Sequence, residues 1–188
     1  MQSLSSADST ASLGRALLAP GLVLGAGYKA RSFALIPAGT LRLLDVGSGT
    51  GDDALELSER LGPNATVMGI DRRLEAVDEA LEKARNVALN VRFAVGDAHS
   101  LPFEDAAFDV VRADFLFGAV EQPLRAVREL SRVLCAHGTL LLSDRSDVLG
   151  GELGVMRAFE RAGFGGLRVV DRFRRDGRPG LTARGLKP

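Results

Sequence analysis

The feature that most constrains this chain is a glycine-rich turn that directly follows an apolar, strand-like run. Residues 43–46 read Leu-Leu-Asp-Val, and residues 47–51 read Gly-Ser-Gly-Thr-Gly. A second apolar run, residues 65–70, ends in Asp71. This order predicts a strand, a tight turn, a helix that begins near Asp52, and a second strand that ends in an acid. Glycines let backbone approach a ligand, a helix N-terminus offers free N–H groups, and a carboxylate can accept from ribose hydroxyls. The pattern predicts a nucleoside site in an α/β sheet.

The spacing of the glycines separates two candidate ligands. A dinucleotide turn has the pattern G-x-G-x-x-G, but Asp52 occupies the third glycine position here, and Asp45 ends the strand before the turn. Acids in these places are unfavourable beside a pyrophosphate. S-adenosylmethionine (SAM) has no phosphate and carries an ammonium and a sulfonium, which suit nearby acids. The turn therefore favours SAM over a nicotinamide dinucleotide.

Later segments continue this pattern in order. They are a strand at residues 91–98 that ends in Gly-Asp-Ala, a strand at 107–114, a helix, glycine turn and strand within 130–142, and Ala-Gly-Phe at 162–164 before a late strand. From residue 41 to about 173, the chain resembles class I SAM-dependent methyltransferases. The resemblance implies an α/β fold with a Rossmann-like doubly wound sheet. This sheet would be mostly parallel with a reversed final strand, and helices would cover both faces.

The chain is expected to hold one folded domain. Residues 1–12 are rich in Ser, Thr and Ala, which predicts disorder, and residues 13–36 are expected to form a loose lid helix over the cofactor. Residues 1–40 are thus the flexible N-terminal segment with its lid helix, and 41–188 the SAM-binding methyltransferase domain. Two segments, 167–173 and 181–186, flank a Gly- and Pro-containing loop and predict a terminal hairpin.

Two helices are expected to bury an apolar stripe against the sheet. The first stripe comprises Leu74, Val77, Leu81 and Ala84, and the second Leu124, Val127, Leu130 and Leu134. The glycine turn is followed by a further helix over 52–61, which Gly62-Pro63 ends.

Composition limits the partners and the compartment. The chain has 24 basic and 24 acidic side chains, so no net field attracts nucleic acid or an anionic membrane. The apolar stretch at residues 13–27 contains Pro20 and is shorter than the roughly 20 residues that a membrane span needs. A lone Cys135 forms no internal disulfide. These features predict a cytoplasmic protein without a membrane segment.

The resemblance assigns most of the site to the cofactor. Asp71 would accept from both ribose hydroxyls, Asp97 would accept from the adenine amino group, and the Ala98 N–H would donate to the ring. Arg72 would lie over the adenine edge or remain an exposed arginine. The expected cofactor-binding set is Asp45, Gly47, Ser48, Gly49, Gly51, Asp71, Arg72, Asp97, Ala98 and Arg112, and no metal is expected.

The stretch after the fourth strand is expected to face the acceptor. Asp114 and Phe117 are the candidate substrate-binding residues. Asp114 is a general base, a substrate anchor, or a partner for an N-terminal residue, and these roles stay open. Many small-molecule methyltransferases place a histidine where Ala119 stands, so histidine-based deprotonation is not expected. His99 and His137 are interpreted as turn residues, and no catalytic residue is assigned.

The sequence therefore predicts methyl transfer from SAM to a small, apolar or aromatic molecule. Two alternatives are a SAM-binding protein or partner subunit that transfers no methyl group, and an NAD(P)-dependent oxidoreductase. The C-terminal segment is basic and could meet a phosphate or a partner, but aromatic side chains for stacking bases are few, which disfavours nucleic acid. The acceptor atom, the substrate and the oligomeric state are left open.

Overall fold

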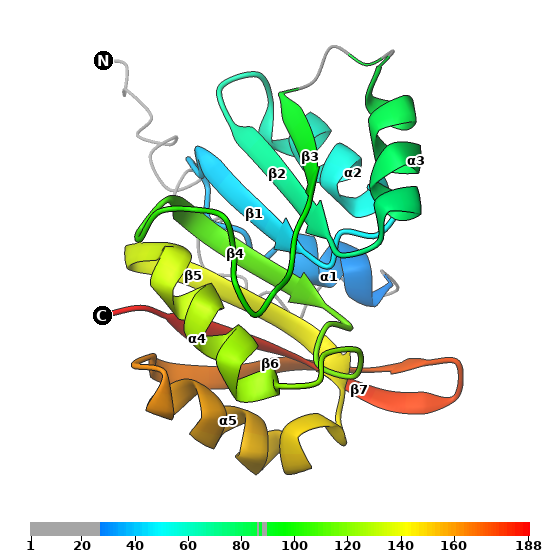
Figure 1. The fold of residues 1–188 in the computed structure, drawn as a ribbon. Coiled ribbons are helices and arrows are strands. Elements are labelled where there is room, and N and C mark those ends of the chain that lie inside the picture. The colour runs from blue at the N-terminus through cyan, green and yellow to red at the C-terminus, as the bar shows by residue number, and fades with distance from the viewer. Residues whose placement is uncertain (1–26, 86, 88–89) are drawn as a thin grey trace, which may run out of the picture.

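The computed structural model describes residues 27–85, 87 and 90–188 (Figure 1). The predicted disorder of residues 1–12 and most of the predicted lid, residues 13–26, lie outside the described residues. The described remainder of the lid contains a short helix, α1 (Tyr28–Phe33).

Seven strands form one sheet in the order β3-β2-β1-β4-β5-β7-β6. All neighbouring pairs are parallel except those made by β7, which runs antiparallel to both β5 and β6. The predicted Rossmann-like, mostly parallel sheet with a reversed final strand is confirmed. The strands are β1 (Arg42–Val46), β2 (Thr66–Asp71), β3 (Val91–Val95), β4 (Phe108–Asp114), β5 (Leu134–Arg145), β6 (Gly165–Arg175) and β7 (Arg178–Leu186).

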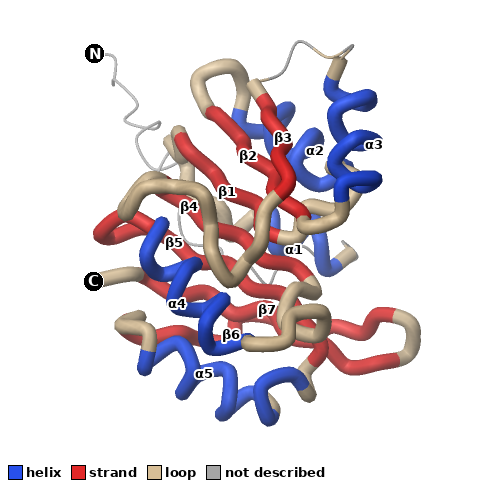
Figure 2. The backbone as a smooth tube through the Cα atoms, viewed as in Figure 1, coloured by secondary structure: helices blue, strands red, loops and turns tan. Residues whose placement is uncertain are grey.

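Helices cover both faces of the sheet, as predicted (Figure 2). One core cluster joins the strands to α1, α2 (Asp52–Leu61) and α3 (Leu74–Ala84). The other joins the opposite face to α4 (Pro123–Val133), which lies in front of the sheet in Figure 1, and to α5 (Glu152–Arg161), which lies along its lower edge there. A short 3-10 helix (Val148–Gly150) connects β5 to α5.

The boundaries of α2 follow from its sequence. Gly51 caps the helix in a left-handed conformation (φ 82°), and Asp52 and Asp53 occupy the first turn, where the helix dipole favours acids. Gly62, also at positive φ, ends the helix. The helix therefore begins and ends where the sequence predicts.

The two predicted helix stripes need correction. In α3, Leu74 and Leu81 are exposed, whereas Ala76, Val77 and Ala80 are buried. The helix is rotated so that small side chains face the sheet, which allows a close approach. In α4, Val127 and Leu130 are buried as predicted, but Leu124 is exposed, and Leu134 is buried as the first residue of β5.

The order of the strands determines where a site can form. The chain passes from β1 outward to β2 and β3, then returns across β1 to β4. Ligands bind outside the carboxyl ends of strands at such a switch point. At the far edge, β6 and β7 form the predicted hairpin, whose tip projects beyond the other strands (Figure 1).

Candidate functional site

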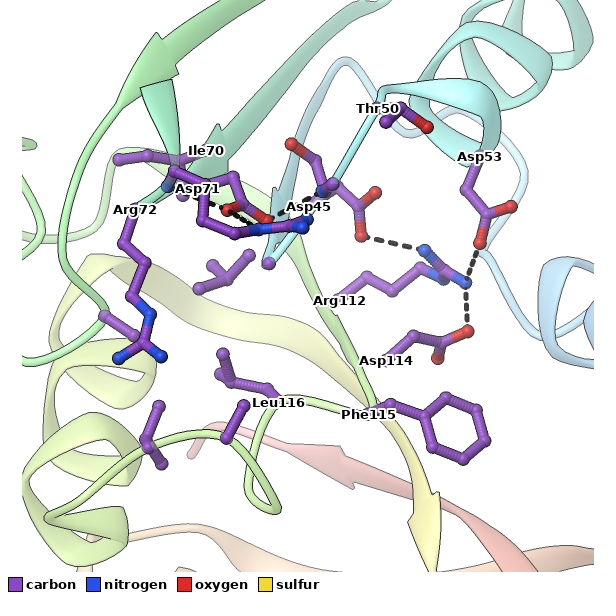
Figure 3. Close-up of a pocket in the computed structure, with 18 of the residues that line it drawn as sticks. Asp45, Thr50, Asp53, Ile70, Asp71, Arg72, Arg112, Asp114, Phe115 and Leu116 are labelled. Atoms are coloured by element: carbon purple, nitrogen blue, oxygen red, sulfur yellow. Dashed lines mark hydrogen bonds and ion pairs between the residues drawn. The ribbon is translucent and has the colours of Figure 1, made fainter. Parts of the chain in front are cut away.

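A cavity of about 570 Å³ lies at the carboxyl ends of β1, β2 and β4 (Figure 3). This volume suits a small molecule or a cofactor. Ten of the twelve predicted site residues line it, namely Asp45, Gly47, Ser48, Gly49, Asp71, Arg72, Asp97, Ala98, Arg112 and Asp114. The two remaining residues, Gly51 and Phe117, lie elsewhere.

The glycine turn is held against the end of β2. The backbone N–H groups of Gly47 and Ser48 both donate to the carbonyl of Ile70, at 2.8 and 3.0 Å. Gly49 has a φ of +55°, a left-handed conformation that L side chains rarely adopt, and it leaves the turn's backbone open to the cavity.

Gly51, which the sequence assigns to the cofactor-binding set, is not among the residues that line the cavity. A Cβ atom there would come within 2.7 Å of the Ala80 Cβ and 2.8 Å of the Phe93 ring. Gly51 therefore allows α2 to pack closely against α3 and β3, on the side of the turn away from the cavity.

Asp71 ends β2 and is fixed by its neighbours. One carboxylate oxygen accepts from the backbone N–H of Gly49 at 2.9 Å, and the other accepts from the backbone N–H of Arg73 at 3.0 Å. Burial alone would raise the pKa of Asp71, but these N–H donors lower it below its usual value, so the side chain is ionised. The oxygen bonded to Arg73 also accepts from the Arg73 Nε at 3.2 Å, whereas the oxygen bonded to Gly49 keeps a second lone pair for a hydroxyl in the cavity.

The turn after β3 forms another wall. Asp97 accepts from the backbone N–H of His99 and from its Nδ1, at 2.9 and 2.7 Å. The His99 Nε2 accepts from the backbone N–H of Gln122 at 3.2 Å, so this histidine braces two loops, in agreement with its interpretation as a turn residue. Arg72 extends along the edge of the cavity (Figure 3). His137 lies near the start of β5 and is not among the residues that line the cavity.

Arg112, on β4, is the centre of a buried charge cluster. Its guanidinium donates to Asp45 at 2.8 Å, to Asp53 at 2.7 Å, and to Asp114 (Figure 3). Burial would lower the pKa of Arg112, but the three carboxylates raise it well above its ordinary value. The arginine therefore stays charged and holds the ends of β1, α2 and β4 in one arrangement.

Asp114, at the end of β4, lines the cavity. Its Oδ2 pairs with Arg112, whereas its Oδ1 is buried without a hydrogen-bond partner among the described residues. Burial raises the pKa of Asp114 to about 6, in spite of the opposing charge of Arg112. A partly buried carboxylate with one free oxygen and a pKa near neutrality is suited to exchange a proton.

The structure adds residues that the sequence did not assign to the site. Tyr28 and Lys29 of α1, Asp53 of α2, and Arg175 at the end of β6 all line the cavity. Lys29 pairs with Asp53 at 2.6 Å, which holds α1 against α2. No sequence motif marks these positions, because they meet only through the fold.

The prediction for Phe117 requires correction. Its ring is buried in the core beside Phe159, with ring centroids 6.0 Å apart, and its backbone N–H donates to Asp144 at 2.9 Å. Phe115 lines the cavity instead. It has a φ of +51°, uncommon outside glycine, so the chain turns sharply after Asp114 and the two rings occupy different sides of the loop.

Two structural observations concern metals and membranes. In the described part of the chain, no group of three or more His, Cys, Asp or Glu side chains is arranged as a metal site. None of the helices within residues 27–85 and 90–188 has the length and apolar character that a membrane crossing requires.

Comparison with known proteins identifies relatives. A family model described as a methyltransferase domain matches residues 38–160. A demethylmenaquinone methyltransferase from Deinococcus radiodurans is 38% identical over 115 residues, which cover 61% of this chain and 47% of the relative. One from Thermus thermophilus is 44% identical over 101 residues, which cover 54% and 46%. The chain thus spans about half the length of these curated relatives.

Solved structures agree with the fold. YcgJ from Bacillus subtilis superimposes with a TM-score of 0.72 at 20% identity and covers 84% of this chain and 98% of its own. A SAM-dependent methyltransferase from Aquifex aeolicus gives a TM-score of 0.68 at 25% identity, over 85% and 87%. The matched domain contains the glycine turn, Asp71, Asp97 and Asp114, and the chain belongs to the class I SAM-dependent methyltransferase family.

Proposed function

We propose that this chain transfers a methyl group from SAM to a small-molecule acceptor with an apolar or aromatic body. The observation that carries the proposal is one continuous cavity with two different ends. The glycine turn and Asp71 line one end, and Asp114 and Phe115 line the other.

The residues present fit SAM. Asp71 offers a second lone pair on its Oδ2 for a ribose hydroxyl, and a second hydroxyl would compete with the exposed Arg73 side chain for Oδ1. Asp97 and Ala98 line the wall expected for adenine. Asp45 has a buried Oδ2 without a hydrogen-bond partner among the described residues, next to the turn. An unsatisfied carboxylate oxygen there suits an ammonium donor. When bound, SAM supplies a methyl group that its sulfonium already activates.

Asp114 would orient the acceptor and accept its proton. Its Oδ1 is free of protein partners in the described residues, while the Oδ2 contact with Arg112 fixes the plane of the carboxylate. An acceptor hydroxyl, amine or acidic C–H that donates to this carboxylate is held in place for attack and becomes more nucleophilic as the proton moves. This choice among the three roles of Asp114 rests on the free oxygen and the raised pKa.

The walls around Asp114 indicate the body of the acceptor. Phe115, Leu116, Ala119 and Val120 line this part of the cavity. Apolar and aromatic walls exclude water and favour a ring or an aliphatic chain. The curated relatives are named demethylmenaquinone methyltransferases, which supports an acceptor of this general character.

Calorimetry and a transfer assay test the proposal together. S-adenosylhomocysteine, the demethylated product of SAM, should bind in the micromolar range, about −8 kcal/mol, and NAD and NADP much more weakly. Radiolabelled SAM should then pass its methyl group to at least one member of a panel of phenols, quinols and arylamines. Tight binding of NAD without binding of S-adenosylhomocysteine would overturn the proposal. Cofactor binding without transfer to any panel member would instead favour a SAM-binding subunit.

A further inference from the structure

A second cavity, of about 490 Å³, adjoins the acceptor end of the first. The two cavities share Phe115 and Arg175, which line both. The second cavity extends from these residues to the turn of the β6–β7 hairpin, where Asp176, Pro179 and Gly180 line it. One aromatic ring and one guanidinium therefore form the boundary between the two cavities.

The second cavity is basic. Arg145 of β5, Arg175 of β6 and Arg178 of β7 line it, against one acid, Asp176. The first cavity, in contrast, is lined by six aspartates and five basic side chains, Lys29, Arg72, Arg73, Arg112 and Arg175. Lys29, Arg73 and Arg112 are each paired with at least one of those aspartates. Positive charge that is largely neutralised in the first cavity is thus in excess in the second.

The three arginines differ in how far the protein already uses them. Arg178 makes no ion pair or side-chain hydrogen bond with another described residue. Arg145 pairs with Asp147 at 3.0 Å, and Arg175 lies 3.8 Å from Asp176 and donates to the Tyr28 hydroxyl at 3.2 Å. These contacts use one or two of the five N–H donors of each guanidinium. Most donors remain for a ligand.

Aromatic packing fixes the shape of this region. The Tyr28 ring stacks on Phe173 with centroids 4.4 Å apart and meets Phe115 edge-on at 5.9 Å. Arg175 lies over the Phe115 ring, 4.3 Å from its centroid. The Phe173 ring lies against Gly180, where a Cβ atom would approach it within 2.3 Å. The wall between the cavities is therefore a packed cluster that joins α1, the loop after β4 and the hairpin.

We propose that the second cavity binds an oxyanion group of the methyl acceptor, a carboxylate or a phosphate. The inference rests on the proposed function and deepens it: the acceptor is an aromatic or apolar molecule that carries its reacting atom at one end and an anionic group at the other. The body would lie against Phe115, with the reacting atom at Asp114 and the anion among Arg145, Arg175 and Arg178. Arginine suits this role because its planar donors match two oxygens of one oxyanion.

Matched pairs of aromatic probes test this subsite. One pair is 2-naphthoate and its neutral amide, and the other is 2-naphthyl phosphate and 2-naphthol; the two pairs separate a carboxylate site from a phosphate site. Binding is measured by calorimetry on the full chain, with and without S-adenosylhomocysteine. We expect at least one anion to bind about tenfold or more tightly than its neutral partner. The preference should weaken as salt is raised from about 0.05 to 0.5 M, because screening acts on the charged probe alone.

Variants then show which residues cause the preference for the anionic probe. The single variant Arg178→Gln and the double variant Arg145→Gln/Arg178→Gln should each remove most of this preference. Arg174→Gln is the matched control, because Arg174 lies on the same hairpin but does not line this cavity. Should a variant fail to fold, as judged by thermal melting, Arg175→Lys replaces it, since a lysine keeps the charge but loses the planar fork. Equal binding of anion and neutral partner to the wild type, or an equal preference in the variants, overturns the proposal.

Binding of S-adenosylhomocysteine, measured on the same preparations, separates the two proposals. If S-adenosylhomocysteine fails to bind and the anion preference is present, the proposed function fails and the basic subsite stands. If S-adenosylhomocysteine binds and the preference is absent, the subsite fails alone. A mixed-sequence oligonucleotide tests the remaining alternative. If the chain binds it tightly, Arg178→Gln weakens that binding, and no small anionic probe binds better than its neutral partner, the arginines serve nucleic acid and the subsite proposal is overturned.

Discussion

The two ends of the site are built in different ways. At the end that we propose for the cofactor, here called the cofactor end, the residues lie at or just after strand ends: the turn at 47–51 follows β1, Asp71 ends β2, and residues 97–99 follow β3. At the acceptor end, Tyr28 comes from α1, Phe115 from the loop after β4, and Phe173 and Arg175 from the hairpin. The first end is rich in aspartates, and the second in aromatic rings and arginines.

This difference separates what topology fixes from what packing fixes. Parallel strands bring their carboxyl ends to one edge of the sheet whatever the loops contain. The positions of the residues at the cofactor end therefore depend on the order and direction of the strands. The acceptor end depends on side chains from distant segments that pack on one another. We therefore expect substitutions at the first end to change cofactor affinity, and substitutions at the second to change turnover and acceptor binding with little effect on the cofactor.

The largest effect is expected at Asp114, where the two ends meet. Asp114→Asn removes the proton acceptor but keeps a side chain of the same size, and Arg112 retains Asp45 and Asp53 as partners. Turnover should fall by about 10²–10⁴-fold, while the affinity for S-adenosylhomocysteine should stay within about twofold. A parallel loss of both would show that Asp114 supports the cofactor end instead.

The same residue predicts a pH dependence. Because burial raises the pKa of Asp114 to about 6, the basic carboxylate form gains population as pH rises through that value. The wild-type kcat/KM should increase with pH, with an inflection near 6, and then level off. The Asn variant should lack this inflection. An unchanged inflection in the variant would assign it to another group or to the acceptor.

The next largest effect is expected at Asp71. Asp71→Ala removes the acceptor of the Gly49 and Arg73 backbone N–H groups and the proposed bonds to ribose. Each charge-assisted bond is worth about 1.5–3 kcal/mol, so affinity for S-adenosylhomocysteine should fall at least about tenfold. Asp78→Ala, an exposed acid on α3, is the control and should change nothing. Unchanged affinity in a folded Asp71→Ala protein would remove Asp71 from the cofactor site.

The same contrast explains how much of the molecule the sequence predicts. The glycine turn, the bounds of α2, and the acids at strand ends are predictable because each depends on a few adjacent residues with a clear physical requirement. Tyr28, Asp53 and Arg175 are not, because their relation to the site exists only after α1 and the hairpin have packed. Two of the assigned residues, Gly51 and Phe117, do not line the cavity, and the reason is local. Both pack on the far side of tight turns, and a motif does not show which way a turn faces.

A smaller effect is expected at Phe115, on the acceptor end alone. Phe115→Leu keeps an apolar wall but removes the edge contacts with Tyr28 and Phe173 and the stack with Arg175. Aromatic pairs contribute roughly 0.5–1.5 kcal/mol, so acceptor KM should rise about 2- to 10-fold. Cofactor affinity should not change. Phe103→Leu, which disturbs an aromatic pair with Phe108, does not touch the cavity and serves as the control. Weaker cofactor binding in Phe115→Leu would contradict the division into two ends.

The smallest effect is expected at α1, which contacts both ends. Lys29 pairs with Asp53 at 2.6 Å on the cofactor side, and Arg31 pairs with Asp171 of β6 at 2.9 Å on the hairpin side. Because the Lys29 side chain is half-exposed, solvent screens its pair, and Lys29→Met should lower the free energy of unfolding by only about 0.2–1 kcal/mol. Denaturant unfolding measures this change. The control is Arg85→Met, which breaks the exposed ion pair between Glu82 of α3 and Arg85 at the C-cap of that helix. The loss should shrink in about 1 M salt, where the Debye length is about 3 Å.

A double-mutant cycle tests whether α1 joins the two ends rigidly. If it does, the changes in the free energy of unfolding caused by Lys29→Met and Arg31→Met should be non-additive by more than about 0.5 kcal/mol. Strict additivity would mean that each end holds α1 independently.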